Sequence, residues 1–200
     1  MSKLLLASHN KGKLSEIQAL LGDLEIDILT PDQLSLAVKV EENGQTYAEN
    51  AALKGVAFAR LSGLLTLADD SGLEVDALDG LPGLRSARFS SKLGASDADR
   101  RAYLLERLRG KPPPWLARFR CVVVLATPAG EVHFAEGACE GEIISEERGE
   151  NGFGYDPVFL LPAMGKTMAE LSMQEKNSLS HRARAVLAAR PILAQLLSIF

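Results

Sequence analysis

An α/β fold is the class that this sequence predicts, because short apolar runs of strand length alternate with longer segments of helical periodicity. Residues 3–7 and 64–68 are apolar runs that suit buried strands. Residues 46–49 and 172–175 match the capping box, which satisfies the first free backbone donors of a helix. We therefore expect strands and helices to build one mixed architecture.

The order of the elements follows from the same patterns. Apolar positions three or four residues apart indicate helices, and Gly63 and Gly110 are placed to end two of them. Pro128-Ala129-Gly130 separates two strand-favouring runs, which predicts an antiparallel hairpin. The expected elements are a strand (3–7), a helix (Leu14, Ile17, Leu20, Leu21), a strand (25–29), a loop through 41–44, a helix (46–61), a strand (64–68), a helix from Ser96 and Asp99 to before Gly110, two strands (117–126, 131–140) and a last helix after Ser178, with Leu179, Ala183, Val186 and Leu187 as its apolar stripe and a kink or restart at Pro191.

Composition limits the class of protein. With 200 residues and 46% hydrophobic composition, the chain is most simply one domain or two closely packed lobes. The formal net charge of -4 argues against a general binder of nucleic acid polymers or anionic membranes. Cys121 and Cys139 have no metal-ligand spacing, so we expect buried free thiols. No signal peptide and no apolar stretch of about 18 residues is found, which places the protein in the cytoplasm.

The acidic pair Asp69-Asp70 is the first candidate for chemistry. It follows the apolar run 64–68 and precedes Ser71-Gly72. This pattern predicts a buried strand that ends by delivering two carboxylates to a sheet edge, where open α/β folds place their ligands. A solvated turn is the alternative, because Asp, Ser and Gly all favour turns.

Two further regions could serve an anionic ligand and its metal ion. Residues 8–13 join a strand to a helix, where free backbone N–H groups and Lys13 favour a phosphate, although the Walker A spacing is missing. The alternative is an ordinary polar helix start. Glu41, Glu42, Asp69 and Asp70 supply the oxygen ligands that suit magnesium, or else they are surface acids in two loops.

The C-terminal third contains an aromatic loop and a group of cations. Residues 151–157 place Phe153 and Tyr155 among glycines, which suits stacking of a flat base, or else forms a hairpin loop that covers the core. Lys176 and the segment 180–182 could converge with Lys54 on an anion or carbonyl, although such residues usually cap, pack or face solvent. H-E-x-x-H and G-x-S-x-G are absent, so metal-assisted phosphate chemistry is favoured over zinc or serine hydrolysis.

Taken together, these segments resemble the inosine triphosphate pyrophosphatase family, also called Ham1-like or XTP/dITP diphosphatases. The resemblance spans nearly the whole chain, 1–200, as one domain. The resembling segments, in the family's order, are 8–13, Glu41-Glu42 with 46–54, 68–73, Pro82-Gly83 with 86–88, 152–157, and Glu175-Lys176 with 179–182.

The resemblance implies an elongated mixed sheet flanked by helices, with two lobes around a central nucleotide-binding cleft, and usually a homodimer. It also implies hydrolysis of ITP, dITP and XTP to the monophosphate and pyrophosphate, with Mg²⁺ as cofactor. Hydrogen-bond donors of the His181-Arg182 region would donate to the 6-keto oxygen of these bases and would be left unpaired by the 6-amino group of ATP. Position by position, it implies that Asp70 is the general base, that Glu41 and Asp70 hold the metal with Asp69 assisting, and that the substrate is bound by Ser8, His9, Asn10, Lys11, Gly12, Lys13, Lys54, Ser71, Phe153, Gly154, Tyr155, Asp156, Lys176, His181 and Arg182.

Two other functions fit the same residues. A Maf-like pyrophosphatase would act on modified pyrimidine or other nucleotides through a similar site. A nucleotide-binding regulator would keep the site without turnover, although the intact set of acids and lysines speaks against it. A panel of nucleotide substrates separates all three.

Overall fold

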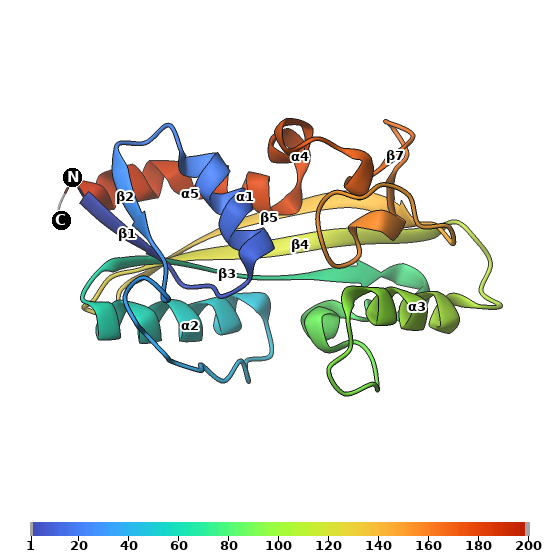
Figure 1. Cartoon of the computed structure of the whole chain (residues 1–200), viewed down its shortest axis with the longest axis horizontal. Coiled ribbons are helices and arrows are strands. Elements are labelled where there is room, and N and C mark those ends of the chain that lie inside the picture. Colours follow the sequence, from blue (N-terminus) through green and yellow to red (C-terminus); the bar gives the residue numbers. More distant parts are fainter. Residues whose placement is uncertain (1, 199–200) are drawn as a thin grey trace. The chain divides into compact units, whose positions relative to one another are not determined.

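The computed structural model describes residues 2–198 and contains the expected alternation of strands and helices (Figure 1). Short 3₁₀ helices add to it at Asp76–Leu78, Gly83–Arg88, Asp156–Val158 and Met168–Glu170. The strands and α-helices are β1 (Ser2–Leu6), α1 (Lys11–Leu21), β2 (Ile26–Leu29), α2 (Tyr47–Ser62), β3 (Leu65–Val75), α3 (Asp97–Leu108), β4 (Trp115–Ala126), β5 (Val132–Ile143), β6 (Phe159–Leu161), β7 (Lys166–Thr167), α4 (Met173–Leu179) and α5 (His181–Leu197).

The strands form one seven-stranded sheet in the order β2-β1-β3-β4-β5-β6-β7. β1 runs parallel to β2 and β3, with Leu4 opposite Ile28 on one side and Leu65 on the other. β6 runs antiparallel to β5 and β7. The sheet is therefore mixed, and the predicted α/β class is confirmed.

The chain divides into two compact units. Unit 1 comprises the residues up to Asp70, Cys121–Gly137 and the residues from His181 onward, and unit 2 comprises Ser71–Arg120 and Ala138–Ser180. Within unit 1, α1 and α5 cover one face of the strands and α2 covers the other (Figure 1). Leu4 and Leu6 of β1 pack with α1 and α5, whereas Leu5 packs with Phe58 of α2. Both faces of β1 are buried, which explains its continuous apolar sequence.

Unit 2 has its own core. Leu104 and Leu108 of α3 pack with Leu73 and Val75 of β3, and all four side chains are fully buried. The helix begins at a complete capping box between Ser96 and Asp99, as the sequence predicts. A second predicted box, at Ser172 and Glu175, starts α4. At Thr46 only half of the box forms, because the Glu49 carboxylate accepts from Gln45 N instead.

Two sequence predictions are wrong. β3 does not end at Asp69-Asp70 but continues to Val75, because Leu73 and Val75 extend the burial of the strand into the second core. The acids therefore lie within an inner strand and not at a sheet edge. In the last helix, the predicted apolar stripe is only partly right: Ala183 and Val186 are buried, but Leu187 is 43% exposed and Leu179 belongs to α4. Pro191 lies inside α5, so the helix does not restart there.

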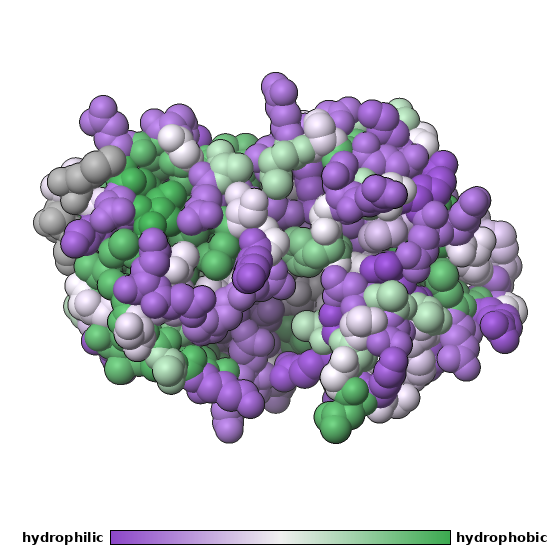
Figure 2. All heavy atoms as spheres, viewed as in Figure 1, coloured by the Kyte–Doolittle hydropathy of each residue, from purple (hydrophilic) through white to green (hydrophobic). Residues whose placement is uncertain are grey.

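Other predictions concern the cysteines and the surface. The two cysteines, Cys121 and Cys139, are free and buried, as the sequence predicts. Figure 2 shows a largely hydrophilic face whose hydrophobic patches gather mainly over β1, β2 and α2. Among the residues of α2, Leu53 and Leu61 are exposed. Among residues 2–198, no helix combines the length and apolar character needed to cross a bilayer.

Gly137 allows β5 to approach the start of α5 closely. A Cβ at this position would lie 2.2 Å from the His181 carbonyl oxygen and 2.5 Å from Ala185 N. Both contacts are with backbone atoms, which cannot move aside as a flexible side chain can. Glycine is therefore required where α5 begins.

We expect Gly137→Ala to lower the free energy of unfolding by about 1–3 kcal/mol, the usual cost of overpacking. Urea denaturation of the variant and the wild type measures the change. Gly22→Ala is the control, because Gly22 has a φ of -68° and its added Cβ would meet only carbonyl oxygens of the preceding helical turn. Equal stability of Gly137→Ala and wild type would contradict the close approach.

Candidate functional site

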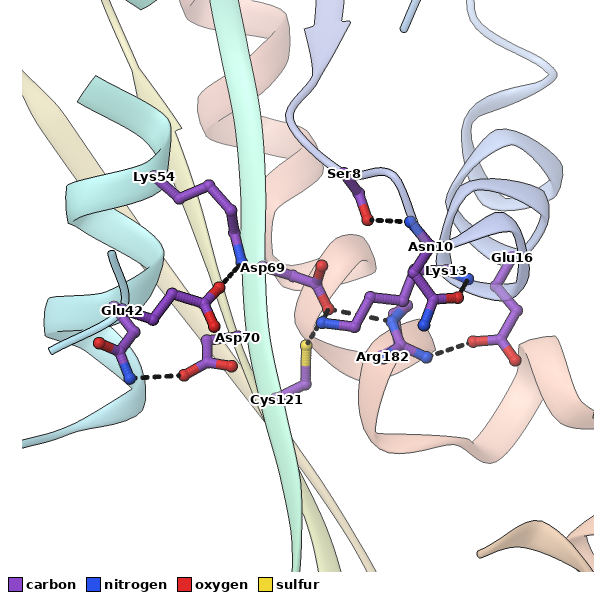
Figure 3. Close-up of polar contacts among 11 residues, drawn as sticks. Ser8, Asn10, Lys13, Glu16, Glu42, Lys54, Asp69, Asp70, Cys121 and Arg182 are labelled. Atoms are coloured by element: carbon purple, nitrogen blue, oxygen red, sulfur yellow. Dashed lines mark hydrogen bonds and ion pairs between the residues drawn. The ribbon is translucent and has the colours of Figure 1, made fainter. Parts of the chain in front are cut away.

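Asp69 is the centre of a buried ionic group in unit 1. Its side chain, on β3, is 1% exposed and accepts from two cations at Oδ2: Lys13 Nζ at 3.0 Å and Arg182 Nε at 3.2 Å. Arg182 also pairs with Glu16 of α1 (Figure 3). We call Lys13, Glu16, Asp69 and Arg182 the ionic group. Its two positive and two negative charges balance, which is the condition for keeping ions inside a protein.

The charges of this group reinforce one another. Burial disfavours the ionised form of Asp69, but the positive charges of Lys13, Arg182 and Lys54 outweigh it and hold the pKa of Asp69 well below its usual range. Burial likewise opposes the charge of Arg182, yet Asp69 and Glu16 raise its pKa further. Both side chains therefore stay charged at any physiological pH.

Cys121 lies beside the same carboxylate, with Sγ 3.9 Å from Asp69 Oδ2. Burial, followed by the negative charge of Asp69, raises the pKa of the thiol to about 12. The thiol stays protonated at neutral pH and so lacks the thiolate that a nucleophilic cysteine needs.

Asp70 has a different environment although it is the next residue. Successive side chains of a strand point to opposite faces, so Asp69 points toward α1 and α5 while Asp70 points toward α2 (Figure 3). Asn50 Nδ2 donates to Asp70 Oδ2 at 3.1 Å. Burial raises the pKa of Asp70, with Lys13 and Lys54 opposing it in part. A carboxylate with a raised pKa is suited to accept a proton, whereas Asp69 is not.

The loop before α2 supplies a second acid on the same side of β3. Lys54 of α2 pairs with Glu42, and the Glu42 and Asp70 carboxylates face each other in Figure 3. The negative charge of Glu42 contributes to the raised pKa of Asp70. Burial opposes the charge of Lys54, but Asp69 and Glu42 raise its pKa, so it remains a cation. Glu41, the neighbouring acid of the same loop, is exposed, and its role as a metal ligand stays a prediction.

These two carboxylates fit a magnesium ion. Mg²⁺ binds proteins through one or two carboxylates and fills its other positions with water and substrate phosphate oxygens. In the part of the chain that the structure describes, no group of three or more His, Cys, Asp or Glu side chains is arranged to hold a metal. A dedicated all-protein cage is therefore not formed, and a site completed by water and substrate suits the residues present.

The loop after β1 prepares the start of α1. Asn10 caps the helix, with Oδ1 accepting from Lys13 N at 3.1 Å, and Asn10 N donates to Ser8 Oγ at 3.2 Å. Lys11, Gly12 and Lys13 form the first turn, where the helix dipole favours an anion. His9 is exposed, and its Nδ1 lies 3.1 Å from Asp32 Oδ1.

In unit 2, the aromatic loop is tied to Lys176. Asp156 Oδ2 accepts from Lys176 Nζ at 2.7 Å and from Phe153 N at 2.8 Å, and both Asp156 and Lys176 are buried. The Lys176 ammonium lies 5.2 Å from the centre of the half-buried Phe153 ring. Tyr155 is directed into the core instead, where its hydroxyl donates to the Ser86 carbonyl oxygen at 2.8 Å.

The sequence identified most of these residues but not their grouping. The structure gathers Lys13, Lys54, Asp69, Asp70 and Arg182 in unit 1, and Phe153, Gly154, Asp156 and Lys176 in unit 2, where Ser71 is half-buried. His181 is buried at the start of α5. Glu16 was missed, although its spacing of three from Lys13 and four from Leu20 places it on the inward face of α1.

Fold and site together define an α/β protein that gathers lysines and carboxylates around one inner strand, β3. The Ham1 family model matches residues 4–192, and the chain belongs to that family. The predicted family is thereby confirmed.

Several relatives and solved structures are similar to this chain over nearly its full length. The chain is 48% identical over 195 residues to the dITP/XTP pyrophosphatase of Desulforamulus reducens, covering 97% of this chain and 96% of that protein. It is 46% identical over 187 residues to the protein of the same name from Geobacter sulfurreducens, covering 93% and 94%. A HAM1 protein structure from Coxiella burnetii has a TM-score of 0.87 at 42% identity, covering 98% of this chain and 100% of that one. The Ham1 protein of Staphylococcus aureus has a TM-score of 0.85 at 38% identity, covering 97% and 99%.

We expect Asp69→Asn to lower the free energy of unfolding at pH 7 by about 3–5 kcal/mol, because it leaves buried cations without a partner. Because the pKa of Asp69 is lower in the folded chain than its ordinary 3.8, its contribution is present above about pH 4 and is lost as the pH falls further. The stability difference between variant and wild type should therefore shrink in acid.

Urea denaturation at several pH values, with chelator present, measures that difference. Asp23→Asn is the control, since Asp23 forms an exposed pair with Arg190 and its loss should change stability little. A difference that is small at pH 7, or that stays constant down to pH 3, would contradict the role given to Asp69.

Proposed function

We propose that this chain hydrolyses non-canonical purine nucleoside triphosphates, namely ITP, dITP and XTP, to the nucleoside monophosphate and pyrophosphate. Such an enzyme removes deaminated purines from the nucleotide pool. Membership of the Ham1 family and the dITP/XTP pyrophosphatase names of its relatives support the proposal. The observation that carries it is Asp70, an acid with a raised pKa beside Lys54 and Glu42.

Asp70 is the proposed general base. Its raised pKa improves its ability to take a proton from the attacking water at neutral pH. Lys13 and Lys54 are proposed to bind the triphosphate and offset the charge that develops on it, together with the backbone N–H groups at the start of α1, Lys176 and Ser71. Phe153 is proposed to stack on the purine. The Arg182 Nε and one terminal nitrogen already bind Asp69 and Glu16, so we assign Arg182 first to holding Asp69.

Nucleotide pyrophosphatases of this family are generally metal-dependent, and we propose Mg²⁺ as the ion, held by Asp70 and Glu42. When bound, the ion would neutralise phosphate charge and make water easier to deprotonate. We propose Glu42 in place of Glu41 because the negative charge of Glu42 acts on Asp70, whereas Glu41 is exposed. A homodimer and a cytoplasmic location complete the proposal.

The decisive test of function is pyrophosphate release from ITP, XTP, GTP and ATP, each with magnesium and with chelator. We expect magnesium-dependent release from ITP and XTP, and much slower release from ATP and GTP. Release from none of them would overturn the proposal. Binding of ITP without hydrolysis would then favour a regulator, and activity on modified pyrimidine nucleotides would favour a Maf-like enzyme.

Asp70→Asn should fold normally and lose roughly 10²–10⁴-fold in kcat, the usual contribution of a general base. Steady-state kinetics on ITP at several magnesium concentrations measures the loss. A loss of rate that high magnesium restores would make Asp70 a ligand only. Asp27→Asn, at an exposed position of β2, is the matched control and should leave kcat unchanged.

Glu42→Gln and Glu41→Gln form a matched pair for the metal site. We expect Glu42→Gln to raise the magnesium concentration needed for half-maximal rate by about tenfold, as removal of a carboxylate ligand from a metal site weakens binding. Glu41→Gln should leave it unchanged. The reverse result would return the ligand role to Glu41.

A further inference from the structure

The loop that carries Phe153 is held from outside by two charged residues of α3. Asp97 Oδ2 accepts from Gly154 N at 2.7 Å, and an Arg101 terminal nitrogen donates to Gly154 O at 2.8 Å. Asp97 and Arg101 are four residues apart, so they lie on the same face of the helix. One residue thus binds the N–H and the other binds the C=O of the same glycine.

Both partners are built for this contact. The Arg101 side chain is 13% exposed, and its other terminal nitrogen binds Glu147 at 2.8 Å, on the segment that leads into the loop. Asp97 also pairs with Arg100. Burial opposes the charge of Asp97, but the Gly154 N–H and Arg100 outweigh it and lower its pKa, so the carboxylate accepts hydrogen bonds throughout the neutral range.

Gly154 needs such a restraint. Its φ of +62° is a left-handed conformation. A glycine can change from this conformation to several others at little cost in energy. The preceding residue, Phe153, is fixed on its N–H side by Asp156. Asp97 and Arg101 therefore fix the other end of the backbone that orients the Phe153 ring.

We propose that Asp97 and Arg101 are positioning residues for the nucleobase: by binding both polar groups of Gly154, they hold the Phe153 ring in the orientation in which it stacks on the purine. This inference rests on the proposed function. Neither residue is assigned contact with the reacting phosphates, so their loss should weaken binding of the base and leave the hydrolytic step intact.

The test compares ITP with ribose 5-triphosphate, which has the sugar and phosphates but no base. We expect Asp97→Ala and Arg101→Ala to raise KM for ITP by about 5- to 10-fold, part of the full contribution of stacking on an aromatic ring. Values of kcat for ITP, and KM for ribose 5-triphosphate, should stay within about twofold of wild type, because chemistry and phosphate binding do not depend on Phe153.

Milder variants and a control distinguish the proposed effect on KM from a general folding defect. Arg101→Lys keeps the charge but can make only one of the two bonds, so it should raise KM for ITP by an intermediate amount. Asp97→Asn keeps an acceptor for Gly154 N and should do the same. Arg107→Ala removes an exposed arginine of α3 whose terminal nitrogen lies 3.3 Å from the Tyr103 hydroxyl, and it should change neither substrate.

Equal increases in KM for both substrates would show a general structural role and overturn the inference, as would an unchanged KM for ITP. If the wild type releases pyrophosphate from neither compound, the proposed function fails. The dissociation constants of the two compounds, measured by calorimetry, then replace KM. Loss of the wild-type preference for ITP over ribose 5-triphosphate in the Asp97 and Arg101 variants would still support the inference, and an unchanged preference would overturn it.

Discussion

The buried pairing of Asp69 with Arg182 and Lys13 is the interaction on which the rest of unit 1 depends. It joins β3 to α1 and α5, and Glu16 completes its charge balance from α1. An ion held in this way fixes the position of β3 relative to both helices, because loss of either partner leaves an uncompensated charge in the interior. Asp70 is the next residue of β3, so the same constraint places it toward α2.

Two adjacent acids thereby acquire different chemistry. Cations surround Asp69 and keep it ionised, whereas burial and Glu42 raise the pKa of Asp70. The strand geometry is what separates them, since neighbouring side chains face opposite sides of the sheet. Asp69 then serves the structure, and Asp70 has the raised pKa that the proposed general base requires. In unit 2, two carboxylates bind the backbone of the loop that carries Phe153: Asp156 accepts from Phe153 N, and Asp97 accepts from Gly154 N.

Much of this could be predicted from the sequence. Apolar periodicity and caps identified α1, α2, α3 and α4, and the ordered motifs identified the family and most polar residues of the site. The rest depends on contacts between segments distant in the chain. Glu16 pairs with a residue 166 positions away, and Gly154 with one 57 positions away. Which of the adjacent acids Glu41 and Glu42 turns toward Asp70 depends on the conformation of the loop before α2. β3 continues beyond Asp69 and Asp70 because its residues Leu73 and Val75 pack in the core of unit 2.

The proposed hydrolysis breaks the bond between the α and β phosphates of the substrate. Phosphorus NMR of ITP incubated with the protein and magnesium distinguishes this bond from the terminal one, because it identifies each phosphorus-containing product. We expect IMP and pyrophosphate as the first products, with no IDP at any time. Accumulation of IDP and inorganic phosphate would place the cleavage at the terminal phosphate and overturn the proposed reaction.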